Sequence, residues 1–137
     1  MKRKIFTIQS ESKYLKPLRN QLRRFLAKLG FKGKELDFLL IALGEACTNS
    51  IRHAYGGEKG HLIRVTVENR KRGIIFKIRD YGHKIVLSKV KTPKLPPDKP
   101  HGLGIYLVKT MVDRLKYNTH HARGNELVLT KYKKRNS

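Results

Sequence analysis

Cysteine and acidic residues are both scarce in this sequence. A single cysteine, Cys47, excludes an internal disulfide. No apolar run approaches the roughly 18 residues of a membrane span, and the N-terminus carries no leader pattern, so we expect a cytoplasmic protein outside the membrane. Only 10 Asp and Glu residues oppose 32 Lys and Arg residues, which gives a formal net charge of +22. Such a charge attracts nucleic acid, nucleotide phosphates or an acidic protein surface, without choosing among them.

Two familiar phosphate-binding motifs are absent as well. The chain has no Gly-x-x-x-x-Gly-Lys-Ser/Thr loop, and its Gly-x-Gly at residues 102–104 follows a proline-rich segment where a dinucleotide fingerprint would follow a strand. His53, His83 and His101 do not form a metal-binding spacing with Cys47, which argues against a zinc site. Any nucleotide pocket in this chain must therefore have another design.

The apolar residues predict a domain of mixed helices and strands that spans residues 1–137. Steps of three and four predict helices, and alternation predicts strands. The expected helices are residues 16–29, 34–55 and 103–112. The expected strands are residues 2–8, 61–69, 74–79, 115–120 and 126–132. Ser10 or Ser12 is expected to cap the first helix, whose opposite side is basic and forms either a solvated face or a docking surface for an acidic partner.

The second predicted helix carries Glu45 and Asn49 four residues apart. Their Cβ atoms should lie about 6 Å apart on one side of the helix, and His53 continues the row. Such a pair can bind one small polar ligand, although solvent-facing residues of an amphipathic helix often have the same spacing. Thr48, Asn49 and Ser50 are poor helix formers, which is unusual inside a purely structural helix.

Two further motifs contain glycine. Asp80-Tyr81-Gly82 places a carboxylate at the end of a predicted strand, beside a residue with free backbone angles. Residues 83–101 are rich in proline and lysine and have no periodicity, which predicts a lid loop or a disordered insert. The helix that follows begins with Gly102-Leu103-Gly104, where bare N–H groups and the helix dipole favour a phosphate. Residues 131–137 are expected to form a basic tail.

Taken in this order, the four motifs resemble those of the GHKL superfamily of ATPases, which also includes the ATP domains of gyrase and sensor histidine kinases. Within it the chain is most similar to the bacterial anti-sigma-factor serine kinases, over nearly its whole length. The resemblance implies a two-layer α/β sandwich. We therefore expect a mixed, mainly antiparallel sheet of about five strands with three helices on one face.

The resemblance also implies an ATP site. Asn49 would ligate the Mg²⁺ that bridges the ATP phosphates. Asp80 would accept a hydrogen bond from the adenine amino group, and Gly82 would let the backbone approach the base. Glu45 would be the general base that takes the proton of a serine or threonine hydroxyl. The phosphates would be lined by Gly102, Leu103 and Gly104.

The same resemblance implies an activity and partners. The protein would phosphorylate an anti-sigma-factor antagonist, control a sigma factor and form a homodimer. Lys84 departs from the usual Asp-x-Gly-x-Gly pattern, and it either contacts phosphate or stiffens the loop and weakens binding. Thr130 on the last strand could reach a water beside the adenine. The alternatives are an ATP-dependent protein-binding switch without catalysis, and a basic nucleic-acid-binding protein with decayed ATP motifs.

Overall fold

The computed structural model describes residues 2–85 and 104–133. Its strands are β1 (Lys2–Gln9), β2 (Leu62–Asn69), β3 (Gly73–Asp80), β4 (Arg114–Asn118) and β5 (Asn125–Tyr132). Its helical elements are a 3₁₀ turn (Ser12–Tyr14), α1 (Leu15–Lys28), α2 (Gly33–Asn49), a π-helical turn (Ser50–Ala54) and α3 (Gly104–Met111). Every helix and strand expected from the sequence is present, and the bounds differ by at most two residues when α2 and the π-helical turn are taken together.

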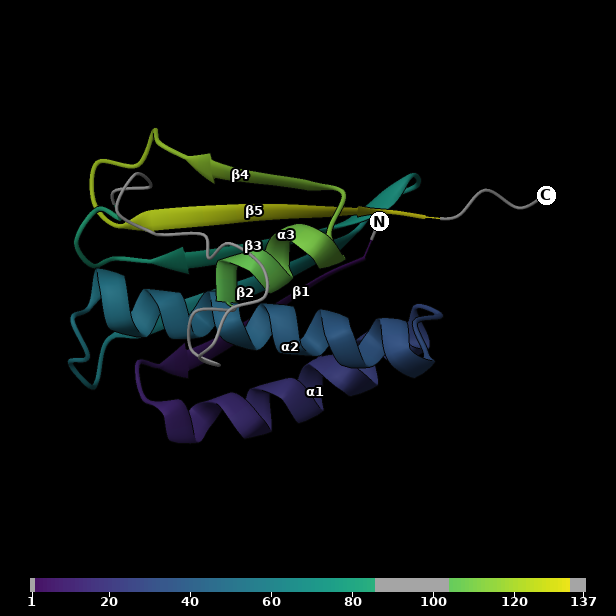
Figure 1. Ribbon diagram of the computed structural model, residues 1–137, viewed down its shortest axis with the longest axis horizontal. Helices are drawn as coiled ribbons and strands as arrows, with labels where there is room; N and C mark the ends of the chain where they lie inside the picture. The colour runs from purple at the N-terminus through teal and green to yellow at the C-terminus, as the bar shows by residue number, and fades with distance from the viewer. Residues whose placement is uncertain (1, 86–103, 134–137) are drawn as a thin grey trace.

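The five strands form one sheet with the order β1-β2-β3-β5-β4, and all of its four pairings are antiparallel. The three helices lie on one face of this sheet, with α2 between α1 and α3 (Figure 1). This arrangement confirms the expected two-layer α/β sandwich. No helix in the described part of the chain has the length and apolar character needed to cross a membrane.

The core lies between the sheet and the helices. Ile74, Phe76 and Ile78 of β3 are almost completely buried, because alternate residues of a strand face the same side. They pack with buried leucines of α1 and α2, such as Leu22 and Leu43, and each such side chain contributes roughly 2 kcal/mol when it leaves water. The next alternate residue of β3 is Asp80, so the same pattern directs a carboxylate toward the helix layer.

Two expectations for the chain ends need correction. Ser10 does not cap a helix, because its hydroxyl donates to the Glu58 carbonyl (2.7 Å) and accepts from the His61 amide (3.0 Å). Lys131 and Tyr132, which the sequence assigned to a basic tail, pair with β3 as part of β5. Residues 134–137, and the predicted lid apart from its first three residues, lie outside the described residues.

Candidate functional site

The carboxylate of Asp80 is the centre of the candidate site. Asp80 ends β3 and is only 1% exposed. Its Oδ1 atom accepts hydrogen bonds from the backbone amides of Gly82 (3.2 Å) and Asn125 (3.2 Å) and from Asn125 Nδ2 (2.9 Å). Its Oδ2 atom is buried and has no hydrogen-bond partner among the described residues. Because an unpaired buried acceptor is costly, this oxygen is ready to receive a donor from a ligand.

Asn125, which the sequence analysis missed, is the closest polar partner of that carboxylate. It begins β5 directly opposite Asp80 and is 6% exposed. Its carboxamide also binds the next turn of the chain, since Nδ2 donates to the His83 carbonyl (2.8 Å) and Oδ1 accepts from the Ile85 amide (2.8 Å). The only sequence signal was the turn at Gly124, which does not reveal which β5 residue faces Asp80.

Gly82 has a packing role that the resemblance did not imply. A Cβ atom at this position would overlap the carbonyl of Ala54, at the end of the π-helical turn. The amide of His83 donates to the same carbonyl (2.7 Å). The hydroxyl of Tyr55 accepts a hydrogen bond from the Tyr81 amide (2.7 Å), and burial raises the pKa of this tyrosine. The glycine therefore lets the chain just after β3 pack directly against the end of the π-helical turn that follows α2.

Lys84 points away from the helix layer. Its ammonium donates to the carbonyl of His121, in the turn between β4 and β5, and its side chain is exposed. Together with the contacts of Asn125, this bond fixes the first residues after Gly82. Of the two roles left open for Lys84, the geometry favours the stiffening of the loop over contact with a phosphate.

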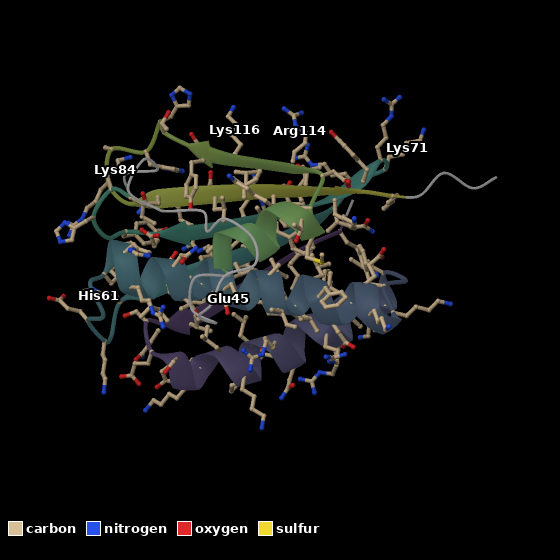
Figure 2. All side chains as sticks on the ribbon, in the orientation of Figure 1. Glu45, His61, Lys71, Lys84, Arg114 and Lys116 are labelled. Carbon is tan, nitrogen blue, oxygen red and sulfur yellow. The ribbon has the colours of Figure 1, made fainter. Side chains whose placement is uncertain are left out.

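Glu45 and Asn49 lie on one side of α2, as their spacing predicted. Both side chains are partly buried, and Figure 2 shows Glu45 on the middle part of this helix. Asn49 Nδ2 is buried without a hydrogen-bond partner. The helix changes to a π-helical turn immediately after Asn49, with the Tyr55 amide bonded to the Ser50 carbonyl (3.1 Å). Such turns are rare and are often found at functional sites.

His53, which was expected to continue the row from Glu45 and Asn49, lies in the π-helical turn. Its side chain is exposed. Cys47 faces the core instead, and burial raises the pKa of its thiol to about 12. Within the described residues no three His, Cys, Asp or Glu side chains are grouped as a metal site.

The start of α3 lies above the part of α2 that carries Glu45 (Figures 1 and 2), and the two helices pack against each other. Gly104 is the first residue of α3, whereas Gly102 and Leu103 lie outside the described residues. Val108 is completely buried and anchors the helix. The backbone amides at the start of α3 therefore belong to the same layer as Asn49, on the side of the sheet that Asp80 faces.

Tyr117 is a second residue that the sequence analysis missed. It lies on β4 opposite Leu127, a buried residue of the helix-facing side of β5. Burial, together with the negative charge of nearby Asp80, raises the pKa of Tyr117 to about 12. Its phenol therefore lies on the helix-facing side of the sheet, within electrostatic range of Asp80.

Thr130 does not reach this site. It pairs with Ile75, whereas Asn125 pairs with Asp80, so the two β5 residues are five positions apart. This separation corresponds to about 17 Å along an antiparallel strand. Thr130 also lies on the helix-free face of the sheet, next to the buried Leu129 that faces the helices. The expectation for Thr130 was wrong because the sequence did not determine the register of β5.

Comparisons with known proteins identify the family of this chain. The family model for the histidine kinase-like ATPase domain matches residues 8–131. The chain is also similar to proteins named serine-protein kinase RsbW. The protein of Bacillus thuringiensis (strain Al Hakam) is 28% identical over 135 residues, covering 91% of this chain and 81% of the relative. The protein of Bacillus mycoides (strain KBAB4) is 29% identical with the same coverage.

A solved structure has the same fold. The RsbU and RsbW domains of Rv1364c from Mycobacterium tuberculosis superpose with a TM-score of 0.68 at 18% identity, covering 96% of this chain. The chain spans only 32% of that longer protein. The resemblance to serine kinases of the GHKL superfamily is thus confirmed. Because the family model matches residues 8–131, which is most of the sequence, the chain belongs to the histidine kinase-like ATPase domain family.

Proposed function

We propose that this protein binds ATP and transfers its γ-phosphate to a serine or threonine of a partner protein. The free, buried Oδ2 atom of Asp80 is the observation that carries this proposal. It lies on the helix side of the sheet, near the place where the π-helical turn after α2 packs against the end of β3. An acceptor with no internal partner suits the exocyclic amino group of adenine.

The start of α3 would receive the phosphates. Gly104 opens this helix, and the unpaired amides of its first turn carry about half a positive charge. We expect Gly102 and Leu103 to extend the same cradle. Asp80 would then hold the base and α3 the phosphates, with the α2 segment close to both.

Asn49 fits the role of an Mg²⁺ ligand. Ligation of the ion would use its carboxamide oxygen, while Nδ2, which is buried without a partner among the described residues, could donate to a phosphate oxygen. Mg²⁺ usually takes one or two protein oxygens and completes its shell with phosphate oxygens and water, so one side chain suffices here. When bound, the ion would neutralise charge on the phosphates.

Glu45 would act as the general base. It lies one helical turn before Asn49, with Cβ atoms about 6 Å apart, which places a carboxylate beside the expected phosphates. Similarity to proteins named serine-protein kinases supports a hydroxyl side chain as the phosphate acceptor. In this role the carboxylate orients the hydroxyl and accepts its proton.

The family likeness extends the proposal to partners. We propose an anti-sigma-factor antagonist as the substrate and a sigma factor as the regulated protein, both in the cytoplasm, with a homodimer as the working form. The exposed cations of α1 provide a surface for an acidic partner. Of these, Lys16, Arg24 and Lys28 have no acidic side chain within salt-bridge distance in the described chain.

The proposal is tested by titration of the protein with ATP, with and without Mg²⁺, and by transfer of labelled γ-phosphate to an antagonist protein. Asn49→Ala should lose Mg²⁺-dependent binding. Glu45→Ala should keep ATP affinity and lose transfer by about 10² to 10⁴-fold. Glu35→Ala removes an exposed carboxylate from the same helix and should change neither property.

The outcomes separate the competing functions. Absence of ATP binding by the parent protein would overturn the site. If the parent protein binds ATP and its partner but transfers no phosphate, the catalytically silent switch is correct. Transfer by Glu45→Ala at the parental rate would remove Glu45 as the base.

Nucleic-acid binding is a second candidate, favoured by the helix-free face of the sheet. Cations of this face with no acidic side chain within salt-bridge distance in the described chain include Arg64, Arg114 and Lys116. Figure 2 shows Arg114 and Lys116 extending away from β4. Both carboxylates of the face, Glu68 and Glu126, are already bonded to other side chains.

A salt titration with single-stranded DNA tests this candidate. Binding should weaken steeply as salt rises, and the double change Arg114→Glu, Lys116→Glu should reduce the logarithmic salt slope by roughly two. The matched change Lys16→Glu, Arg24→Glu on α1 should preserve the parental binding. Absence of binding at about 0.15 M salt would remove nucleic acid as a partner.

A further inference from the structure

Three hydrogen bonds hold the side-chain carboxamide of Asn125. Its Nδ2 atom donates to Asp80 Oδ1 (2.9 Å) and to the His83 carbonyl (2.8 Å), and its Oδ1 atom accepts from the Ile85 amide (2.8 Å). A rotation of the carboxamide by 180° would place oxygen against a carboxylate and a carbonyl. The network therefore allows only one orientation of this amide.

This orientation determines which oxygen of Asp80 is available. Oδ1 is engaged by three N–H groups, two of which come from Asn125. Oδ2 is left buried and unpartnered. Asp80 and Asn125 can lie this close because Gly124 has no side chain. A Cβ atom at Gly124 would overlap the Asp80 carbonyl. The pair is thus fixed by both backbone and side-chain contacts.

We propose that Asn125 is a positioning residue that sets the base selectivity of the ATP site. It holds the carboxylate of Asp80 so that the free oxygen presents only an acceptor to the ligand. The same carboxamide fixes the backbone at His83 and Ile85, so base recognition and the path of the chain after Gly82 depend on one side chain. This inference rests on the proposed binding of ATP.

The expected selectivity concerns one substituent of the purine ring. Adenine carries an amino group at position 6, which donates to an acceptor, whereas hypoxanthine carries an oxygen there. A fixed, buried carboxylate oxygen binds the adenine amino group. It repels the 6-oxygen of hypoxanthine, because neither that oxygen nor Asp80 Oδ2 can donate a hydrogen bond. A carboxylate free to rotate or to contact water would discriminate less.

Competitive titration with ATP and inosine triphosphate tests the proposal. The parent protein should bind ATP at least about tenfold more tightly than inosine triphosphate. Asn125→Ala should weaken ATP binding by about tenfold and leave inosine triphosphate nearly unchanged, so that the ratio collapses. Asn125→Asp keeps the shape and the acceptor for the Ile85 amide but turns an oxygen toward Asp80, and it should reduce the ratio at least as far.

Asn118→Ala is the matched control. Asn118 Nδ2 also donates to a carboxylate, Glu126 Oε1 (3.0 Å), at the same end of the sheet. Its removal should leave the nucleotide ratio at the parental value, although the melting temperature falls.

The outcomes distinguish this inference from the proposed function. A parental ratio retained in both Asn125 variants would overturn the positioning role and leave ATP binding intact. Equal losses for the two nucleotides would overturn it as well, since loosened packing affects both. A parent protein that binds neither nucleotide would overturn the ATP site itself and this inference with it.

Discussion

Asp80 and Glu68 are the two buried carboxylates of the described sheet, and their surroundings differ in kind. Asp80 is 1% exposed on the helix side of β3, and Glu68 is 5% exposed on the helix-free side of β2. Each oxygen of Glu68 has a cation, with Arg70 at 2.7 Å from Oε1 and Lys77 at 2.8 Å from Oε2. Asp80 has three N–H donors on one oxygen and none on the other.

Under the proposed function, the difference separates a structural carboxylate, Glu68, from a ligand-binding one, Asp80. The charge of Glu68 is neutralised within the protein, which leaves little capacity for a ligand. The unpaired oxygen of Asp80 lowers the free energy of unfolding, and no contact among the described residues offsets this loss. We infer that a ligand supplies the missing donor, and the same change made at both positions can test this.

Asp80→Asn should produce the largest effect. In this variant an amide nitrogen replaces Oδ2, and it cannot accept a hydrogen bond from the adenine amino group. The variant also lacks the negative charge of the carboxylate, which strengthens that hydrogen bond. We expect ATP affinity to fall by roughly a hundredfold, as measured by calorimetric titration. The melting temperature should change little or rise, because a buried charge with an unsatisfied oxygen is removed.

The matching change Glu68→Gln serves as the control for that titration. It replaces a buried carboxylate by an amide on the neighbouring strand, without approaching the candidate site. ATP affinity should stay at the parental value. Equal losses of ATP affinity in the two variants would contradict the distinction, because they would indicate a general effect of altered charge.

The sequence was sufficient to predict which helices and strands exist and to single out candidate residues for the chemistry. Helical and strand periodicities placed every element, and motif spacing singled out Glu45, Asn49 and Asp80. These features are local, since each depends on residues within a few positions along the chain. The structure places Glu45 and Asn49 on α2 in the helix layer and Asp80 on the helix-facing side of β3.

Features that depend on contacts between distant strands were not predictable. The expectation for Thr130 was wrong, and Asn125 was missed, because strand register follows from packing across the sheet, which one sequence does not reveal. The packing of Gly82 against Ala54 joins segments 28 residues apart. The π-helical turn was signalled only by the poor helix formers Thr48 and Ser50.

Glu68→Gln should have a smaller effect, and on stability alone. Lys77 and Arg70 are partly exposed, at 34% and 50%, so their cations can return to water when the carboxylate is lost. We therefore expect a loss of about 1 kcal/mol in the free energy of unfolding at neutral pH. This corresponds to a fall of about 4 °C in melting temperature.

The acid dependence of that loss sharpens the comparison further. Hydrogen bonds from Lys77 and Arg70 lower the pKa of Glu68 below its ordinary value, although burial acts in the opposite direction. A carboxyl with a lowered pKa in the folded state stabilises the fold above its unfolded pKa of about 4.3 and loses this contribution as the pH falls through the folded value. The stability difference between the parent protein and Glu68→Gln, measured by urea denaturation, should therefore shrink below about pH 4. A difference that stays constant down to about pH 2 would show that packing of the side chain, and not its charge, accounts for the loss.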